Sequence, residues 1–118
     1  MNMYRELEIW KESVVLIKVV YKLAETLPRS EEYNLKQQLR RAVVSVTLNI
    51  AEGKNRKSEK DFCNFLTIAI GSLSEVDAIL AVCEELDYFK CSVEIRNSIE
   101  VLGKRINALR SKLQRSNI

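Results

Sequence analysis

The chain holds 118 residues, which fits a single domain because domains commonly span about 100 to 200 residues. One proline and three glycines provide few turns, and no segment alternates β-branched and polar residues, so an all-α fold is expected. The chain contains no histidine, which excludes Ser-His and Cys-His nucleophilic pairs and the commonest zinc sites. We therefore expect no enzyme, no cofactor and no metal site.

The first predicted helix covers residues 7–27. Its apolar residues recur at spacings of three and four, which places them along one side of a helix. Pro28 follows and ends the helix, because proline disfavours the helical conformation in the residue before it. Two neighbouring stripes make the apolar face wide: Trp10, Val14, Ile17, Tyr21 and Ala24, and beside them Leu16, Val20, Leu23 and Leu27.

The second predicted helix covers residues 33–52 and is apolar on more than one side. Gly53 is expected to end it, because glycine readily adopts the left-handed conformation that closes many helices. The basic run from Lys54 to Lys57 would then connect it to the third helix. The residues of its main apolar face are Leu35, Leu39, Val43, Val46 and Ile50.

The third and fourth predicted helices cover residues 58–87 and 92–115. Ser58 can cap the third helix together with Asp61, and Ser92 can cap the fourth. Both carry apolar stripes of seven-residue periodicity, which pack helices at shallow angles, and the short connections favour antiparallel neighbours. The sequence therefore predicts one antiparallel up-down-up-down four-helix bundle over residues 1–118. The stripes are Phe62, Leu66, Ala69, Leu73, Val76, Leu80 and Cys83, then Ile95, Ile99, Leu102, Ile106, Leu109 and Leu113.

Charge is distributed unevenly along the chain, although the net charge is only +3. Residues 34–60 and residues 90–118 each hold seven basic and two acidic side chains, whereas residues 61–89 hold six acidic and no basic ones. The two basic segments favour a nucleic-acid partner. The alternation of sign favours, to at least the same degree, attraction between helices of one bundle or between copies of it.

Cys63, Cys83 and Cys91 are odd in number and show no Cys-x-x-Cys spacing, so we expect buried free thiols. No run of eighteen apolar residues occurs, and residues 1–10 mix acidic and basic side chains instead of showing a basic segment before an apolar one. These features predict a soluble cytoplasmic protein without a membrane partner.

Several segments carry a resemblance to a known family. They read Gln38-Leu39-Arg40-Arg41-Ala42 with Ser45-Val46 and Asn49-Ile50-Ala51-Glu52-Gly53, then Phe65-Leu66-Thr67-Ile68-Ala69-Ile70-Gly71-Ser72 with Glu75, and, nearer the N-terminus, Leu7-Glu8-Ile9-Trp10-Lys11 and Leu27-Pro28 through Tyr33-Asn34-Leu35. These segments closely resemble the four-helix-bundle proteins of the 23S rRNA intervening-sequence family. The similarity covers about residues 4–90, and the fourth helix matches only in its apolar pattern.

The resemblance implies a non-enzymatic protein that associates with RNA or another nucleic acid and assembles into a homopentameric ring. Members of the family are encoded within insertions in bacterial large-subunit ribosomal RNA genes and elsewhere, which implies a bacterial, ribosome-related setting. Similar proteins serve as accessory factors of diversity-generating reverse transcriptases. Many relatives carry a helix-kinking proline two residues before the motif asparagine, and this chain departs from them with Thr47.

Six basic residues are candidates for a nucleic-acid surface, because arginine and lysine bind phosphate. Arg40 lies about 20 Å from Lys54 along the second helix at about 1.5 Å per residue, so the candidates form two groups unless neighbouring subunits join them. Alternatively, Arg40 or Arg41 pairs with Glu52, Glu75 or another acid inside the bundle or across subunits. The candidates are Arg40, Arg41, Lys54, Arg56, Lys57 and Lys60.

A second group of residues is expected to act in helix packing or assembly. Asn49 continues the apolar spacing of its helix, so it should face the bundle or a partner helix and fix register or oligomeric state. Gly71 in the middle of the third helix suggests that the second helix approaches closely there. The residues given this role are Asn49, Glu52, Gly53, Gly71, Ser72 and Glu75.

Two functions from different classes follow. The first is a homo-oligomeric protein that binds the backbone of RNA or DNA through basic surfaces, with little sequence preference because no aromatic residues interleave the basic run. The second is a scaffold or adaptor that binds a protein partner and uses its charges for helix and subunit pairing. A basic face without acidic partners favours the first, and charge pairs across subunits favour the second.

Overall fold

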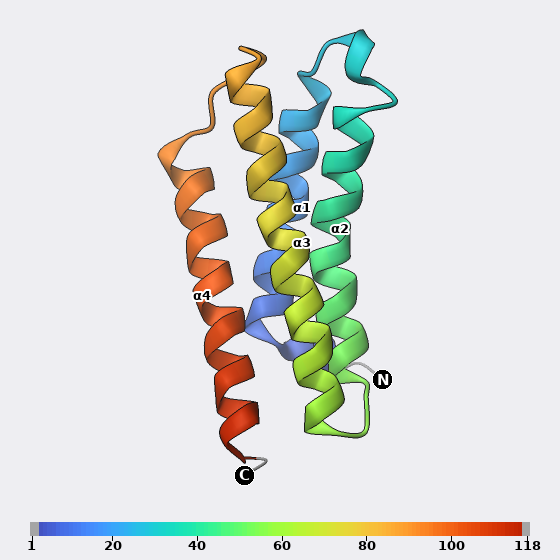
Figure 1. Ribbon diagram of the computed structural model, residues 1–118, viewed down its shortest axis with the longest axis vertical. Coiled ribbons are helices and arrows are strands. Elements are labelled where there is room, and N and C mark those ends of the chain that lie inside the picture. The colour runs from blue at the N-terminus through green and yellow to red at the C-terminus, as the bar shows by residue number, and fades with distance from the viewer. Residues whose placement is uncertain (1–2, 117–118) are drawn as a thin grey trace.

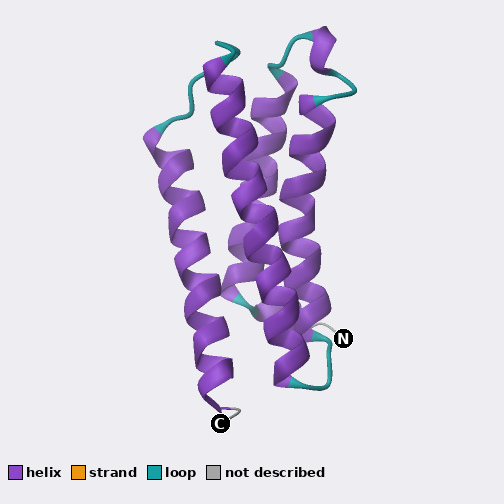
Figure 2. Cartoon of the chain, in the orientation of Figure 1, coloured by secondary structure: helices purple, strands orange, loops and turns teal. Residues whose placement is uncertain are grey.

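The computed structural model describes residues 3–116, which form a bundle of four long helices (Figure 1). Figure 2 shows short loops between the helices and no strand in this part of the chain. Consecutive helices run antiparallel and contact one another, and α4 also contacts α1. The predicted all-α up-down-up-down four-helix bundle is confirmed. Its helices are α1 (Glu8–Glu25), α2 (Leu35–Lys54), α3 (Glu59–Glu85) and α4 (Val93–Ser116), with short 3-10 helices at Met3–Glu6 and Arg29–Glu31.

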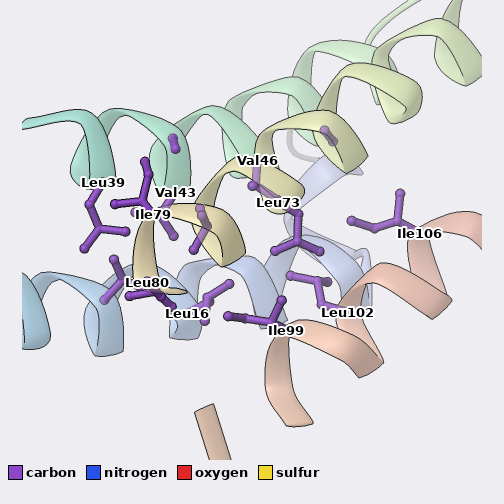
Figure 3. Packing of buried hydrophobic residues seen from close by; sticks show 14 of the residues in the cluster. Leu16, Leu39, Val43, Val46, Leu73, Ile79, Leu80, Ile99, Leu102 and Ile106 are labelled. Carbon is purple, nitrogen blue, oxygen red and sulfur yellow. The ribbon is translucent and has the colours of Figure 1, made fainter. Parts of the chain in front are cut away.

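Most of the predicted apolar stripes meet along the bundle axis and form the core (Figure 3). The wide apolar face predicted for the first helix is buried only in part, because Leu16, Val20, Ala24 and Leu27 are buried whereas Tyr21 is exposed. All seven stripe residues of α3 are buried, and Leu66 and Val76 are fully enclosed. Burying one such side chain stabilises the fold by roughly 1.5 to 3 kcal/mol. In α4 only Ile99, Leu102 and Ile106 are buried, because this helix packs mainly on α3 and less on α1. The core is therefore centred on α3.

By length and composition, α3 would also suit a membrane span, and it is the one helix within residues 3–116 that does so. Ten of its residues are buried inside the bundle, where it contacts α2 and α4. The core helix of a bundle can have the length and hydropathy of a membrane-spanning helix.

Hydroxyl groups fasten α2 to the helices on both sides of it. The Thr47 hydroxyl donates to Ser13 Oγ of α1 over 2.8 Å, and Ser13 Oγ donates to the Trp10 carbonyl over 2.7 Å. On the other side, the hydroxyls of Ser45 and Ser72 share a hydrogen bond of 2.8 Å between α2 and α3. Because buried polar groups without partners are costly, these bonds favour one register of the three helices.

The two mid-chain glycines have roles opposite to those predicted. Gly53 does not end α2, which continues to Lys54, and Gly53 does not adopt the left-handed conformation. It is buried where α2 meets α3, and a Cβ there would lie 2.8 Å from Phe62 Cδ1 and 2.8 Å from Phe65 Cβ. The predicted close approach at Gly71 is wrong, since a Cβ at this exposed position would meet nothing within 4 Å. Close helix approach therefore requires a glycine at position 53.

Replacing each glycine by alanine should change stability in opposite directions. Gly71→Ala should raise the free energy of unfolding by about 0.5 to 1 kcal/mol, because alanine is the better helix former. Gly53→Ala should lower it by about 1 to 3 kcal/mol, since Phe65 Cβ is fixed to its backbone and cannot move aside. Urea denaturation followed by circular dichroism measures both. Stabilisation by Gly53→Ala would show that α2 and α3 do not pack as described.

Glu84 orders the connection between α3 and α4. Its carboxylate accepts the backbone N–H of Cys91 over 2.9 Å and pairs with Arg96 of α4. These two donors, the Cys91 N–H first, hold the pKa of Glu84 below its ordinary value. The three cysteines are free and buried, as predicted, and burial raises the pKa of the Cys83 and Cys91 thiols.

The lowered pKa of Glu84 predicts a loss of stability in acid. A carboxyl group whose folded pKa is depressed stabilises the fold above its unfolded pKa of about 4.3, and this contribution disappears as pH falls through the folded value. Glu84→Gln should therefore lower the melting temperature at pH 7 and flatten its decline between about pH 5 and pH 3. The matched control is Glu85→Gln at the neighbouring exposed position. Equal pH profiles for the two variants would contradict the role of Glu84.

Candidate nucleic-acid interface

Basic side chains from two distant parts of the sequence meet at one end of the bundle. The turn between α2 and α3 and the C-terminal end of α4 both lie at the lower end in Figure 1. Arg110 Nη1 of α4 donates to Thr67 Oγ1 of α3 over 3.1 Å, and the Ser116 hydroxyl donates to the Glu59 carboxylate. We call this surface the basic end; its residues are Lys54, Arg56, Lys57, Lys60, Arg110, Lys112 and Arg115.

The topology explains why these charges meet. In an up-down-up-down bundle the C-terminal ends of the second and fourth helices lie at the same end. Of these seven residues, the predicted candidates included Lys54, Arg56, Lys57 and Lys60 and missed Arg110, Lys112 and Arg115. The antiparallel topology was itself predicted, so combining it with the two basic segments could have placed all seven residues together.

Three residues of the basic end are engaged within the chain. The Lys54 ammonium lies 5.9 Å from the centre of the Phe62 ring. The Arg56 guanidinium lies 4.7 Å from the centre of the Phe65 ring and pairs with Glu52 over 3.5 Å. Arg110 also donates to Asn107 over 2.8 Å. These contacts hold the cations in place and leave less of their charge for a ligand.

The other four residues of the basic end are open to solvent. Lys57, Lys60, Lys112 and Arg115 are exposed, and none forms an ion pair with another residue in the range 3–116. Exposed ammonium and guanidinium groups without acidic partners attract phosphate as point charges or bidentate donors. These four side chains are the strongest candidates for a nucleic-acid contact.

Arg40 and Arg41 lie elsewhere, in the first half of α2, about 20 Å along the helix axis from Lys54 at its end. Arg40 pairs with Glu25 of α1, and its guanidinium lies 5.2 Å from the centre of the Tyr21 ring. Arg40 therefore has the alternative role, because it pairs with an acid of the same bundle. Arg41 is exposed and pairs with no acid among the described residues.

The residues assigned to packing or assembly lie mostly along the outer edge of the α2–α3 contact. Asn49 is half-buried, and its Nδ2 donates to the Ser45 carbonyl over 2.8 Å and to Ser45 Oγ over 3.0 Å. It thus supports the Ser45–Ser72 bond and does not reach another helix itself. Glu75 is exposed and has no ion-pair partner between residues 3 and 116.

The fold and this surface define a class of protein, which is a small four-helix bundle with a basic end. No group of three or more His, Cys, Asp or Glu residues in the described part of the chain could hold a metal ion.

The family model for the 23S rRNA-intervening sequence protein matches residues 5–108, and the chain belongs to this family. The match extends into α4, beyond the range of about 4–90 over which the sequence resemblance was described. The likeness to accessory proteins of diversity-generating retroelements stays a prediction.

A solved structure shares the fold. It is a protein with unknown function from the S23 ribosomal protein family of Bacteroides thetaiotaomicron, with a TM-score of 0.64 and 22% sequence identity over 89% of this chain and 94% of that chain. A comparison with curated proteins finds no match.

Neighbouring arginines of α2 should differ in their effect on stability. Arg40→Ala should lower the free energy of unfolding by about 1 kcal/mol, because it removes the contact with Tyr21 and the packing of the arginine stem. Arg41→Ala should change it by less than about 0.5 kcal/mol, as is usual for an exposed position. Chemical denaturation compares the two. An equal loss of stability in both variants would contradict the contact of Arg40 with Glu25 and Tyr21 of α1.

Proposed function

We propose that the protein is a non-enzymatic homo-oligomer that binds RNA or another nucleic acid through its basic end. One observation carries the proposal: four exposed cations without acidic partners among the described residues lie at one end of the bundle and come from two segments of the chain. Membership of the 23S rRNA-intervening sequence protein family supports an RNA-related role. A bacterial cytoplasmic setting is part of the proposal.

The chemistry of the basic end favours contacts to phosphate over contacts to bases. The rings of Phe62 and Phe65 lie under the cations of Lys54 and Arg56, so they do not form a platform on which bases could stack. Binding through phosphate depends little on sequence and weakens steeply with salt, because each contact releases a counterion. For about four contacts to a single strand, the slope of log affinity against log salt would be about −3.

Self-association would strengthen such weak binding. A cyclic assembly repeats the basic end once per subunit on the same side, and a nucleic acid that spans several subunits gains affinity from the high local concentration of sites. The resemblance implies a ring of five, and we include homo-oligomerisation in the proposal on that basis.

A matched pair of variants tests the nucleic-acid site. Reversing the four exposed cations of the basic end (K57E/K60E/K112E/R115E) should abolish binding of a fluorescent single-stranded RNA at about 50 mM salt. The control reverses four exposed cations elsewhere (K18E/K22E/R29E/K90E), which also form no ion pair within residues 3–116, and should retain most of the affinity. Fluorescence anisotropy with RNA and with duplex DNA measures both.

Two outcomes would refute the proposal. Wild-type protein that binds neither RNA nor DNA at low salt would refute it directly. An equal loss of affinity in both quadruple variants would show that net charge, and not the basic end, governs binding.

The second candidate is a scaffold or adaptor that binds a protein partner. It assigns the charges to helix and subunit pairing, and pairing between helices is observed, since Arg40 and Arg105 both pair with glutamates of α1. The pattern shows that many charges serve packing between and along the helices, whereas the four exposed cations of the basic end do not.

A further inference from the structure

The two motif segments of α2 and α3 lie side by side on one outer face of the bundle. The hydrogen bond between Ser45 and Ser72 marks the level at which the two helices meet. Neither the core nor the basic end accounts for the exposed residues of these segments. We call this surface the α2–α3 face and define it by Arg41, Leu48, Ile68 and Glu75.

Antiparallel geometry places these residues in two rows. Arg41 lies four residues before Ser45, and Glu75 lies three residues after Ser72, so both lie about one turn away in the same direction. Leu48 lies three residues after Ser45 and Ile68 four before Ser72, so they lie at a common level on the opposite side of the serine pair. One row holds opposite charges and the other holds two aliphatic side chains.

The face has unused binding capacity. Leu48 is 61% exposed and Ile68 50% exposed, which is high for large aliphatic side chains on neighbouring helices at the same level. Arg41 and Glu75 are exposed and form no ion pair with any residue from 3 to 116. A shallow depression of about 360 Å³ lies beside Leu48 and Arg41, and it is lined also by Asn49 and by Tyr21 of α1.

Nucleic acid is a poor fit to this face. Glu75 would repel phosphate, and the aliphatic row offers no ring on which a base could stack. A protein surface with an aliphatic centre and charges of both signs matches it better, because core contacts are apolar and flanking charges set orientation.

We propose that the α2–α3 face binds a second copy of this chain, with Arg41 of one copy against Glu75 of the next and Leu48 against Ile68. This inference rests on the homo-oligomer of the proposed function and names its contact surface. The inference is supported by charge complementarity. In a cyclic assembly whose rotation axis is parallel to the bundle axis, each residue lies at the same position along that axis in every copy. Residues at one level in a single chain then meet at one level between chains.

The same contact serves a two-fold pair and a ring. In a two-fold pair, the α2 and α3 rows of both copies meet each other, and the contact forms twice. In a ring, the α2 row of each copy meets the α3 row of the next, and the contact forms once per interface. The molecular mass distinguishes these cases, and the Arg41–Glu75 contact is common to both.

The groove between α1 and α4 is the competing surface and supplies a control. It measures about 420 Å³ and is lined by apolar side chains that include Val15, Val19 and Val101. Val101 is 48% exposed, close to the exposure of Ile68. Glu12 at its edge pairs with Arg105 of α4, and Glu94, which also lines the groove, is exposed and forms no ion pair among residues 3–116, so the uncompensated charge there has a single sign. The groove between α1 and α4 therefore lacks the pair of opposite charges that would indicate a second copy of the chain as its partner.

Charge reversal and its rescue test the contact. Arg41→Glu and Glu75→Arg should each weaken self-association by about tenfold or more, and the double variant R41E/E75R should return to within about threefold of wild type, because the pair is restored with exchanged signs. Leu48→Glu should also dissociate the assembly, whereas Val101→Glu should leave it intact. Sedimentation velocity over a range of concentrations measures the mass, and circular dichroism confirms that each variant is folded.

Specific results would overturn the inference. The wild-type protein could remain a monomer at about 100 µM, or the single charge variants could keep the wild-type mass. The double variant could fail to restore the assembly, or Val101→Glu could dissociate it while Leu48→Glu does not. Loss of RNA affinity in Arg41→Glu at unchanged mass would assign the face to nucleic acid instead.

RNA binding measured on the same samples separates the two proposals. A monomer that still binds RNA in a salt-dependent manner would refute homo-oligomerisation and the contact between copies, and it would leave the role of the basic end standing. An assembly with the expected response to R41E/E75R that binds no nucleic acid would refute only the role of the basic end.

Discussion

The packing of α2 on α3 is the contact on which the rest of the structure depends. Gly53 lets the end of α2 lie directly against Phe62 and Phe65, and the Ser45–Ser72 bond sets the register farther along the helices. A bulkier residue at position 53 would push the start of α3 away and displace the turn that carries Lys54 to Lys57. The same register determines that Arg41 and Glu75 share one level. The α2–α3 face and the α2–α3 part of the basic end therefore both follow from this helix pair, and α4 adds Lys112 and Arg115 to the basic end.

Electrostatics divides the charged residues into two sets with different consequences. One set is paired within the chain, as Arg40 is with Glu25 and Arg105 is with Glu12, and it contributes to the contacts between helices. The other set is exposed and forms no ion pair among residues 3–116; four of its members lie at the basic end, where long-range attraction to phosphate is the expected effect. Net charge alone would not reveal this division, because the total of +3 averages over both sets.

Membership of the 23S rRNA-intervening sequence protein family and the likeness to the Bacteroides thetaiotaomicron structure agree with the observed bundle. A four-helix bundle by itself implies no function, since one scaffold can carry many different sites. The case for nucleic-acid binding and for self-association therefore rests on particular surfaces of this chain. These surfaces lie on different parts of the molecule, so one assembly can use both at once.

The bundle could be predicted from the sequence, because apolar periodicity is a local property that can be read along each helix. In the third helix, all seven residues of the periodic stripe that begins at Phe62 and ends at Cys83 are buried, as that pattern requires.

Features that depend on a second helix could not be read in this way. Gly53 and Gly71 are the same residue type in helices, yet only tertiary packing shows which one touches a neighbour. Arg40 and Arg41 are adjacent in sequence, but about 100° of helical rotation separates an arginine held by α1 from one that faces solvent. Which charges stay unpaired could not be predicted, because ion pairing depends on distances between helices that the sequence does not contain.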